Sequence, residues 1–157
     1  MSESIASRLQ NKNIALPDIP PPAANYLPWT IAGSLLFISG QLPLVNGRLA
    51  ITGRLGDGVT LEEGKKAAEF CAINILAVAK AALQGDLERI VRLAKLQGFV
   101  ASTPDFTDQH LVINGASDLL VGVLGERGKH ARAAVGMAAL PLNAAVEIDA
   151  VFEVRQK

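Results

Sequence analysis

Two charged side chains in the last thirty residues could act on a small acidic molecule. Arg132 lies in a run of small residues, and its guanidinium could hold a carboxylate through two parallel hydrogen bonds, which a lysine cannot copy. The alternative is an ion pair at a subunit interface. Glu147 could orient a water molecule and accept its proton, or it could pair with Arg132 or Lys95.

Three residues nearer the N-terminus could complete a site. Ser39 ends a predicted strand and is followed by Gly40, where the missing side chain lets backbone groups approach a ligand closely. The Ser39 hydroxyl could bind a carboxylate, or it could cap a turn. Tyr26, the single tyrosine, could close a pocket or simply pack.

The other reactive residues and motifs give weaker evidence of a functional site. Cys71 is the single cysteine, so the chain can form no internal disulfide, and its apolar helical neighbours predict a buried, inert thiol. His110 and His130 lack the spacing of metal ligands, so we expect no metal site. The glycine-rich segment 53–58 does not match a phosphate-binding loop, and we expect an ordinary loop there.

The elements that would position these residues follow from periodicity and capping. We expect strands at 29–32, 35–39, 48–51, 90–102, 131–140 and 144–155, and helices at about 60–83 and 103–124. Thr60 and Glu63 form a capping-box pattern at the first helix. The order βββαβαββ predicts an α+β sandwich, with one six-stranded, mostly antiparallel sheet and both helices on one face. Residues 1–157 then form one domain, with 1–22 as a short helix and a proline-rich arm.

The two C-terminal strands indicate how the sheet faces are used. The last strand alternates clearly, and its apolar set should face the helices: Val146, Ile148, Ala150, Phe152 and Val154. In the strand before it, we expect the core face to consist of Ala133, Val135 and Met137. The opposite face then carries Arg132 and three small residues: Ala134, Gly136 and Ala138. That small-residue face predicts a subunit interface, unless alanine is merely tolerated on a crowded sheet.

Composition narrows the class of protein. Half of the 157 residues are hydrophobic and the formal net charge is zero, which excludes bulk disorder, argues against a dedicated nucleic-acid binder and favours self-association. The polar N-terminal segment lacks the apolar run of a signal peptide, and no apolar run is long enough to span a bilayer. We therefore expect a cytoplasmic protein.

Two motifs resemble one family. Ser39-Gly40-Gln41 resembles a signature of the Rid/YjgF family, the reactive intermediate deaminases, and the segments 131–135, 140–141 and 146–150 resemble its C-terminal signature. The resemblance covers about 25–154. It implies a chorismate-mutase-like fold and a homotrimer with a cleft at each subunit interface.

The resemblance also implies an activity without a cofactor: hydrolysis of small enamines and imines, such as 2-aminoacrylate and its imine, to 2-keto acids and ammonia. The family's carboxylate-binding arginine falls on Arg132 and its water-associated glutamate on Glu147. Substrate contacts are implied for Ser39 and its neighbour Gly40, for Tyr26 and for Asn114: together these are the predicted site residues.

One difference from the family's C-terminal motif leaves other functions possible. Many family deaminases carry a cysteine where this chain has Ala134. A trimer that binds a small carboxylate without turnover is therefore an alternative. A third, endoribonuclease or translation inhibitor, follows labels used in the family, but the neutral charge and the few aromatic residues disfavour it.

Overall fold

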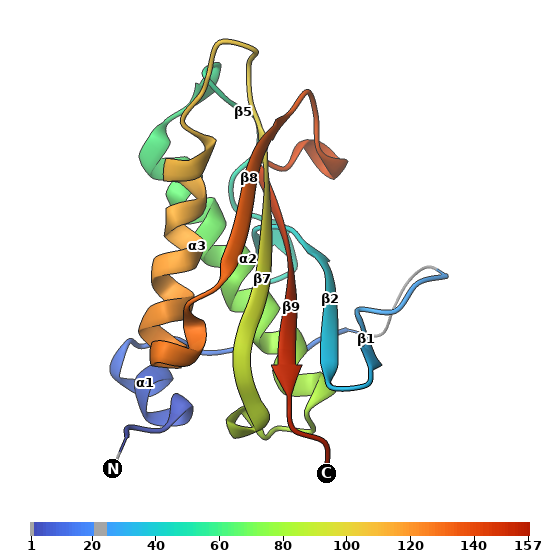
Figure 1. Ribbon diagram of the computed structural model, residues 1–157. Coiled ribbons are helices and arrows are strands. Elements are labelled where there is room, and N and C mark those ends of the chain that lie inside the picture. Colours follow the sequence, from blue (N-terminus) through green and yellow to red (C-terminus); the bar gives the residue numbers. More distant parts are fainter. Residues whose placement is uncertain (1, 21–24) are drawn as a thin grey trace.

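The main sheet has five strands in a computed structural model that describes residues 2–20 and 25–157. Its order is β1-β2-β9-β7-β8, and all neighbours are antiparallel except β7 and β8 (Figure 1). The strands are β1 (Trp29–Ala32), β2 (Leu35–Gln41), β7 (Ile90–Ala101), β8 (Ala131–Met137) and β9 (Val146–Val154). The expected α+β class and mostly antiparallel sheet are confirmed.

The predicted sixth strand does not join this sheet. Residues of that segment form β4 (Arg48–Leu49), which pairs with β3 (Leu44–Val45) as a separate hairpin. Asn46 and Gly47 both have positive φ, 52° and 76°, as a tight two-residue hairpin turn requires. The turn returns the chain onto β3 and not onto the sheet. A second small pair joins β5 (Arg54–Leu55) to β6 (Gly58–Val59).

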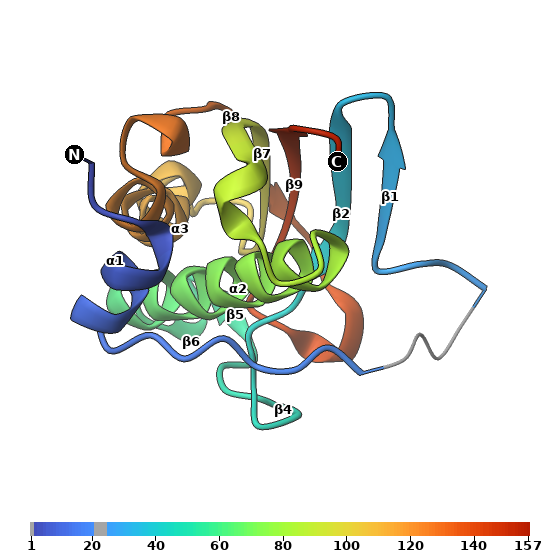
Figure 2. The same cartoon turned by 90° about the horizontal axis from the view of Figure 1, so that it is seen from below.

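Helices α2 (Leu61–Ala82) and α3 (Gln109–Leu124) cover one face of the sheet, as expected (Figure 2). The Thr60–Glu63 capping box is present at the start of α2. The second helix begins later than its predicted start at residue 103, because residues 103–108 form a turn and a loop. The two helices lie very close together, since a Cβ atom at Gly115 of α3 would collide with the backbone carbonyl of Lys65 in α2.

Strand β9 follows the predicted alternation. Val146, Ile148, Ala150, Phe152 and Val154 are buried, and the residues between them are half-exposed. The buried set lies between the sheet and the helices and supplies the centre of the core. Glu147 therefore points to the open face of the sheet, the face that α2 and α3 leave uncovered.

The faces of β8 are the reverse of the prediction. Arg132 pairs with Leu96 of β7, which is fully buried against the helices, and paired residues of neighbouring strands point to the same side. A Cβ atom at Gly136 would lie 2.7 Å from Ser102 Oγ and 2.8 Å from Gln109 Nε2, so this face lies against α3. Val135, assigned to the core, is 43% exposed. The small residues on this face make room for a helix of the same chain.

The N-terminal segment is docked on the domain. Helix α1 (Ile5–Asn11) buries Ile5 and Leu9, the stripe that the sequence predicts. Glu88 anchors its first turn: the carboxylate accepts the Ile5 backbone N–H at 2.7 Å and an Arg127 N–H at 2.9 Å. Part of the proline-rich arm, 21–22, lies outside the described residues. Within the described chain, no helix is long and apolar enough to cross a membrane.

Candidate active site

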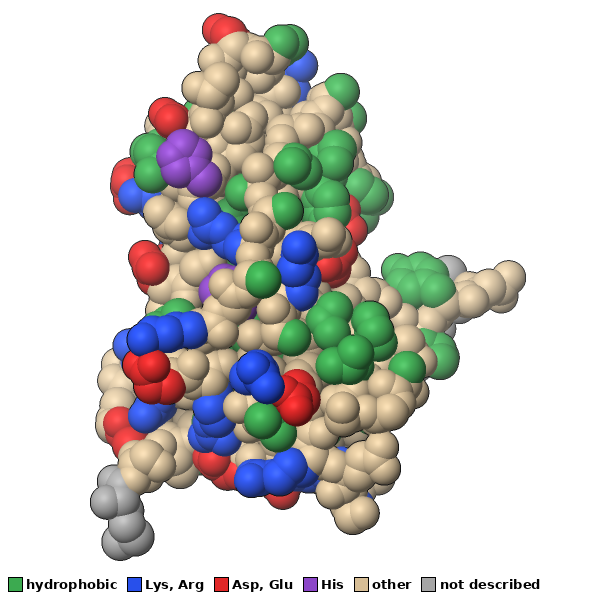
Figure 3. All heavy atoms as spheres, viewed as in Figure 1, with side chains coloured by type: hydrophobic (Ala, Val, Ile, Leu, Met, Phe, Trp, Pro, Cys, Tyr) green, Lys and Arg blue, Asp and Glu red, His purple; other side chains and the backbone are tan. Residues whose placement is uncertain are grey.

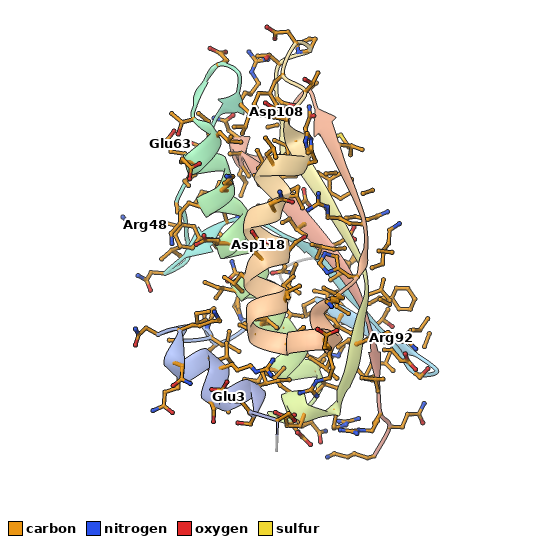
Figure 4. All side chains as sticks on the ribbon, turned by 60° about the vertical axis from the view of Figure 1, so that its left-hand side comes forward. Glu3, Arg48, Glu63, Arg92, Asp108 and Asp118 are labelled. Carbon is orange, nitrogen blue, oxygen red and sulfur yellow. The ribbon has the colours of Figure 1, made fainter. Side chains whose placement is uncertain are left out.

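Helix α3 holds the Arg132 guanidinium in place. Nη1 donates to Asn114 Oδ1 at 2.8 Å and to Ser117 Oγ at 3.1 Å, and Nη2 donates to the His110 carbonyl at 3.2 Å. All three partners lie on α3, the helix on which Figure 4 labels Asp118. The structure therefore brings Arg132 and Asn114, two of the predicted site residues, into direct contact.

These contacts leave one edge of the guanidinium open. Arginine carries five N–H groups, and α3 takes three of them. The Nε–H and one Nη2–H have no partner within residues 2–20 and 25–157, and Arg132 is half-exposed. In an arginine side chain, the Nε–H and the Nη2–H beside it point the same way, which is the arrangement that binds both oxygens of a carboxylate.

Glu147 lies on the open face, beside a bulge in β2. The pairing of β2 with β9 shifts register between Ile38 and Gln41, and Gly40 lies in that irregular stretch. A Cβ atom at Gly40 would collide with the carboxylate of Glu147, so the glycine leaves the space that this position of the Glu147 side chain occupies. Burial raises the pKa of Glu147, and the nearby Asp149 carboxylate raises it further.

The same bulge is tied to the segment before β1. The Ser39 hydroxyl donates to the Leu27 carbonyl at 2.7 Å, and the Ser39 N–H donates to the Pro28 carbonyl at 3.0 Å. Tyr26 lies one residue before Leu27 and is 67% exposed, so it does not pack into its own chain. Glu147, Gly40 and Ser39 thus form a second group, with Tyr26 on the segment that Ser39 holds.

The predicted site residues therefore fall into two groups. We call Arg132, Asn114, Ser117 and His130 the arginine cluster, and Glu147, Gly40 and Ser39 the glutamate cluster. The sequence interpretation put Arg132 and Glu147 on the same sheet face; this is wrong, because Arg132 shares the helix side with Leu96, whereas Glu147 points to the open side. One chain alone does not bring the two groups together.

Sequence reasoning missed Ser117 and the role of His130. His130 Nε2 lies 2.9 Å from Ser117 Oγ, and its Nδ1 lies 2.6 Å from the Gly128 carbonyl oxygen. Spacing offered a signal: Asn114 and Ser117 are three residues apart, on one side of a helix, and His130 is two residues before Arg132 in an extended segment.

In the part of the chain that the structure describes, neither Cys71 nor a metal site supplies a reactive centre. Cys71 is fully buried, its Sγ lies 3.7 Å from the Val146 carbonyl, and burial raises its thiol pKa well above the ordinary value. In the described part of the chain, no three His, Cys, Asp or Glu side chains are grouped so as to hold a metal ion.

Known proteins resemble this chain over nearly its whole length. The crystal structure of Atu1372 from Agrobacterium tumefaciens, a protein of unknown function, is 58% identical, with a TM-score of 0.91 over 96% of this chain and 92% of that one. A Shewanella oneidensis structure described as a putative endoribonuclease is 33% identical, with a TM-score of 0.92 over 97% of this chain and 100% of that one. Protein TCP17 of Trypanosoma cruzi is 48% identical over 97% of this chain and 95% of its own length.

Structures named RidA and TdcF share the fold less closely. The RidA structure from a Psychrobacter species is 28% identical, with a TM-score of 0.58 over 86% of this chain and 93% of that one. The sequence match to a protein family runs from residue 6 to residue 154 and so takes in both clusters. The chain belongs to the family described as YjgF/chorismate mutase-like, putative endoribonuclease, which confirms the Rid/YjgF resemblance.

Proposed function

We propose that this protein hydrolyses small enamines and imines of the 2-aminoacrylate type to 2-keto acids and ammonia, without a cofactor. The observation that carries the proposal is the open Nε/Nη2 edge of Arg132, held in place by three hydrogen bonds from α3. Such an edge recognises the carboxylate that both the imino or enamino acid and its 2-keto acid product carry. A related structure of E. coli TdcF is described with bound serine, which is also a small carboxylate.

The glutamate cluster supplies the second requirement, a base for water. An imine carbon is already electrophilic, so water needs only to be held and deprotonated. Glu147 accepts the proton as the water oxygen bonds to the carbon, and it returns that proton to the imine nitrogen to give a carbinolamine. The same carboxylate then moves the hydroxyl proton to the amino group, so that the C=O bond forms, the C–N bond breaks and ammonia leaves. A raised pKa suits this role, since a base is most effective when its pKa approaches the working pH.

Assembly would join the two clusters. We propose that the protein is a homotrimer and that each site combines the arginine cluster of one subunit with the glutamate cluster of its neighbour. The open sheet face supports association, because it exposes apolar side chains: Phe37 is 39% exposed, Leu35 37% and Val135 43%. Figure 3 shows hydrophobic side chains gathered over the strands, to the right of the helices. This replaces the interface predicted on the other face of β8.

Binding without turnover is the second candidate. Ala134 packs against the core beside Arg132, at the position where the resemblance implies a cysteine in many deaminases. A carboxylate could still bind the guanidinium edge if no reaction followed.

One assay separates the two functions. An amino-acid oxidase generates imines from several amino acids in situ, and release of ammonia and 2-keto acid is followed with and without the protein. The proposal predicts acceleration that Arg132→Ala abolishes. Wild-type protein that binds a 2-keto acid but accelerates no imine would support the binding function instead.

A further inference from the structure

We propose that Ser117 and His130 are positioning residues that select which edge of Arg132 faces the ligand. The inference rests on the proposed carboxylate binding by Arg132 and extends it to two residues that do not touch the ligand. Its basis is a hydrogen-bonded chain that runs from the Gly128 carbonyl through His130 and Ser117 to the guanidinium.

The direction of each hydrogen bond in this chain follows from the first one. A backbone carbonyl can only accept, so His130 Nδ1, 2.6 Å from the Gly128 oxygen, carries the proton. Neutral His130 then presents a lone pair at Nε2, and Ser117 must donate its hydroxyl proton across the 2.9 Å contact. The oxygen lone pairs of Ser117 are left to accept from Arg132 Nη1.

The directions of these hydrogen bonds limit which N–H groups of Arg132 are available to a ligand. Nη1 gives one N–H to Ser117 and the other to Asn114, so both of its protons are occupied. Nη1 is the terminal nitrogen on the Cδ side of the guanidinium, and Nη2 is the one on the side of the Nε–H. The group therefore cannot use its Nη1/Nη2 end for a ligand and must offer the Nε/Nη2 edge. Ser117 and His130 hold the guanidinium from behind, on the side away from the carboxylate.

A serine beside a histidine also suggests a nucleophile, and the surroundings argue against that. Ser117 Oγ already donates to His130 and accepts from Arg132. It lies in the middle of α3, where backbone N–H groups are used within the helix, so no pair of them is available to stabilise an oxyanion. Positioning is the role that these contacts support.

The tautomer of His130 tests the chain directly and without a ligand. Nitrogen NMR of the imidazole ring, recorded in alkaline buffer where imidazoles are neutral, should show the proton on Nδ1. Free histidine prefers the other tautomer, so this result would reflect the Gly128 contact. A proton on Nε2 would overturn the proposal, because Ser117 would then have no acceptor at His130.

Substitution tests the consequence for binding. Ser117→Ala should weaken pyruvate binding about tenfold, as expected when a charged group loses a hydrogen-bond partner and its fixed orientation. Rotation about the Cζ–Nη1 bond of Arg132, measured by NMR, should also become faster in ligand-free protein, because Ser117 holds one of the Nη1 protons. Ser117→Thr, which keeps the hydroxyl, should restore both values, and Ser34→Ala in the exposed β1–β2 turn is the matched control.

The outcomes separate this inference from the proposed function. If wild-type protein binds pyruvate through Arg132 and Ser117→Ala changes neither affinity nor the rate of rotation at Nη1, the positioning role is wrong and carboxylate binding stands. If wild-type protein does not bind pyruvate, the proposed function fails. The tautomer and the rate of rotation at Nη1 then decide the positioning role by themselves.

Discussion

The arginine cluster and the glutamate cluster are built in different ways. Arg132 is fixed by directed hydrogen bonds from one helix of its own chain, and the open edge of its guanidinium is all that it offers outward. Glu147 is placed by steric fit against Gly40, on a face that its own helices leave uncovered. The arginine cluster is held by hydrogen bonds within one chain, whereas the glutamate cluster lies on a sheet face that α2 and α3 leave uncovered. The difference supports the proposal of a site shared between subunits.

The largest effect is expected at Glu147. Glu147→Gln keeps the size of the side chain and removes the base, so turnover of an in situ imine should fall about 10²- to 10⁴-fold. Affinity for pyruvate should stay near the wild-type value, because Arg132 is untouched. Steady-state kinetics and calorimetry together check this. A parallel fall in both quantities would instead assign Glu147 to the scaffold.

Arg132→Lys should lower the affinity for pyruvate. The charge remains, but the parallel pair of N–H donors is lost, and loss of a buried charge-assisted pair costs about 2–5 kcal/mol. Pyruvate affinity should therefore fall at least tenfold while the fold, followed by circular dichroism, is unchanged. Affinity equal to that of the wild type would show that Arg132 is structural.

A matched pair on β8 tests the assignment of its two faces. Val135→Lys puts a charge on the open face and should dissociate the trimer into folded monomers, measured by light scattering. Gly136→Val crowds Ser102 and Gln109 under α3 and should lower the free energy of unfolding by about 1–3 kcal/mol without changing the mass. The reverse pattern would restore the originally predicted interface.

The smallest expected effect is on stability as a function of pH. Because the folded-state pKa of Glu147 is raised, by burial and by Asp149, the native state holds this proton more tightly than the unfolded chain. Its contribution to stability is present at low pH and is lost as the pH rises through the folded-state pKa. Glu147→Gln should therefore raise the melting temperature at pH 7 and change it less at pH 4.

Glu88→Gln is a control for which the expected shift in melting temperature has the opposite sign. Partial burial acts to raise its pKa, but the Ile5 N–H and Arg127 outweigh burial and lower it. Its stabilising contribution is present above the unfolded-state pKa and is lost as the pH falls through the folded-state value. Glu88→Gln should lower the melting temperature at pH 7. If both variants shift it in the same direction, the carboxylate environments have been misassigned.

The success of the sequence predictions depended on the size of the residues in each strand. In β9, the buried residues are all apolar and three of the four residues between them are acids, so the orientation of Glu147 could be predicted from the strand alone. In β8, alanine and glycine occur on both faces, and the orientation of Arg132 depends on its partner Leu96 in β7. A pattern within one strand cannot contain that information.

The arginine cluster was only partly predictable for a related reason. Arg132 and Asn114 were identified through motifs, but the contact of Ser117 with His130 depends on how α3 returns to the start of β8. That path passes through a short 3₁₀ turn, Gly125–Gly128, whose shape the sequence pattern does not specify. Motif matching finds the residue that touches a ligand more readily than those that hold it.

Subunit mixing tests the shared site most directly. Arg132→Ala and Glu147→Gln chains are refolded separately and together, in equal amounts, and imine hydrolysis is measured. If each site takes its arginine from one subunit and its glutamate from the next around a closed ring, about a quarter of the sites in the mixture contain both wild-type residues. The account predicts that each variant alone is nearly inactive and that the mixture recovers about this fraction of wild-type activity. No recovery, with mixed trimers verified by mass spectrometry, would contradict it.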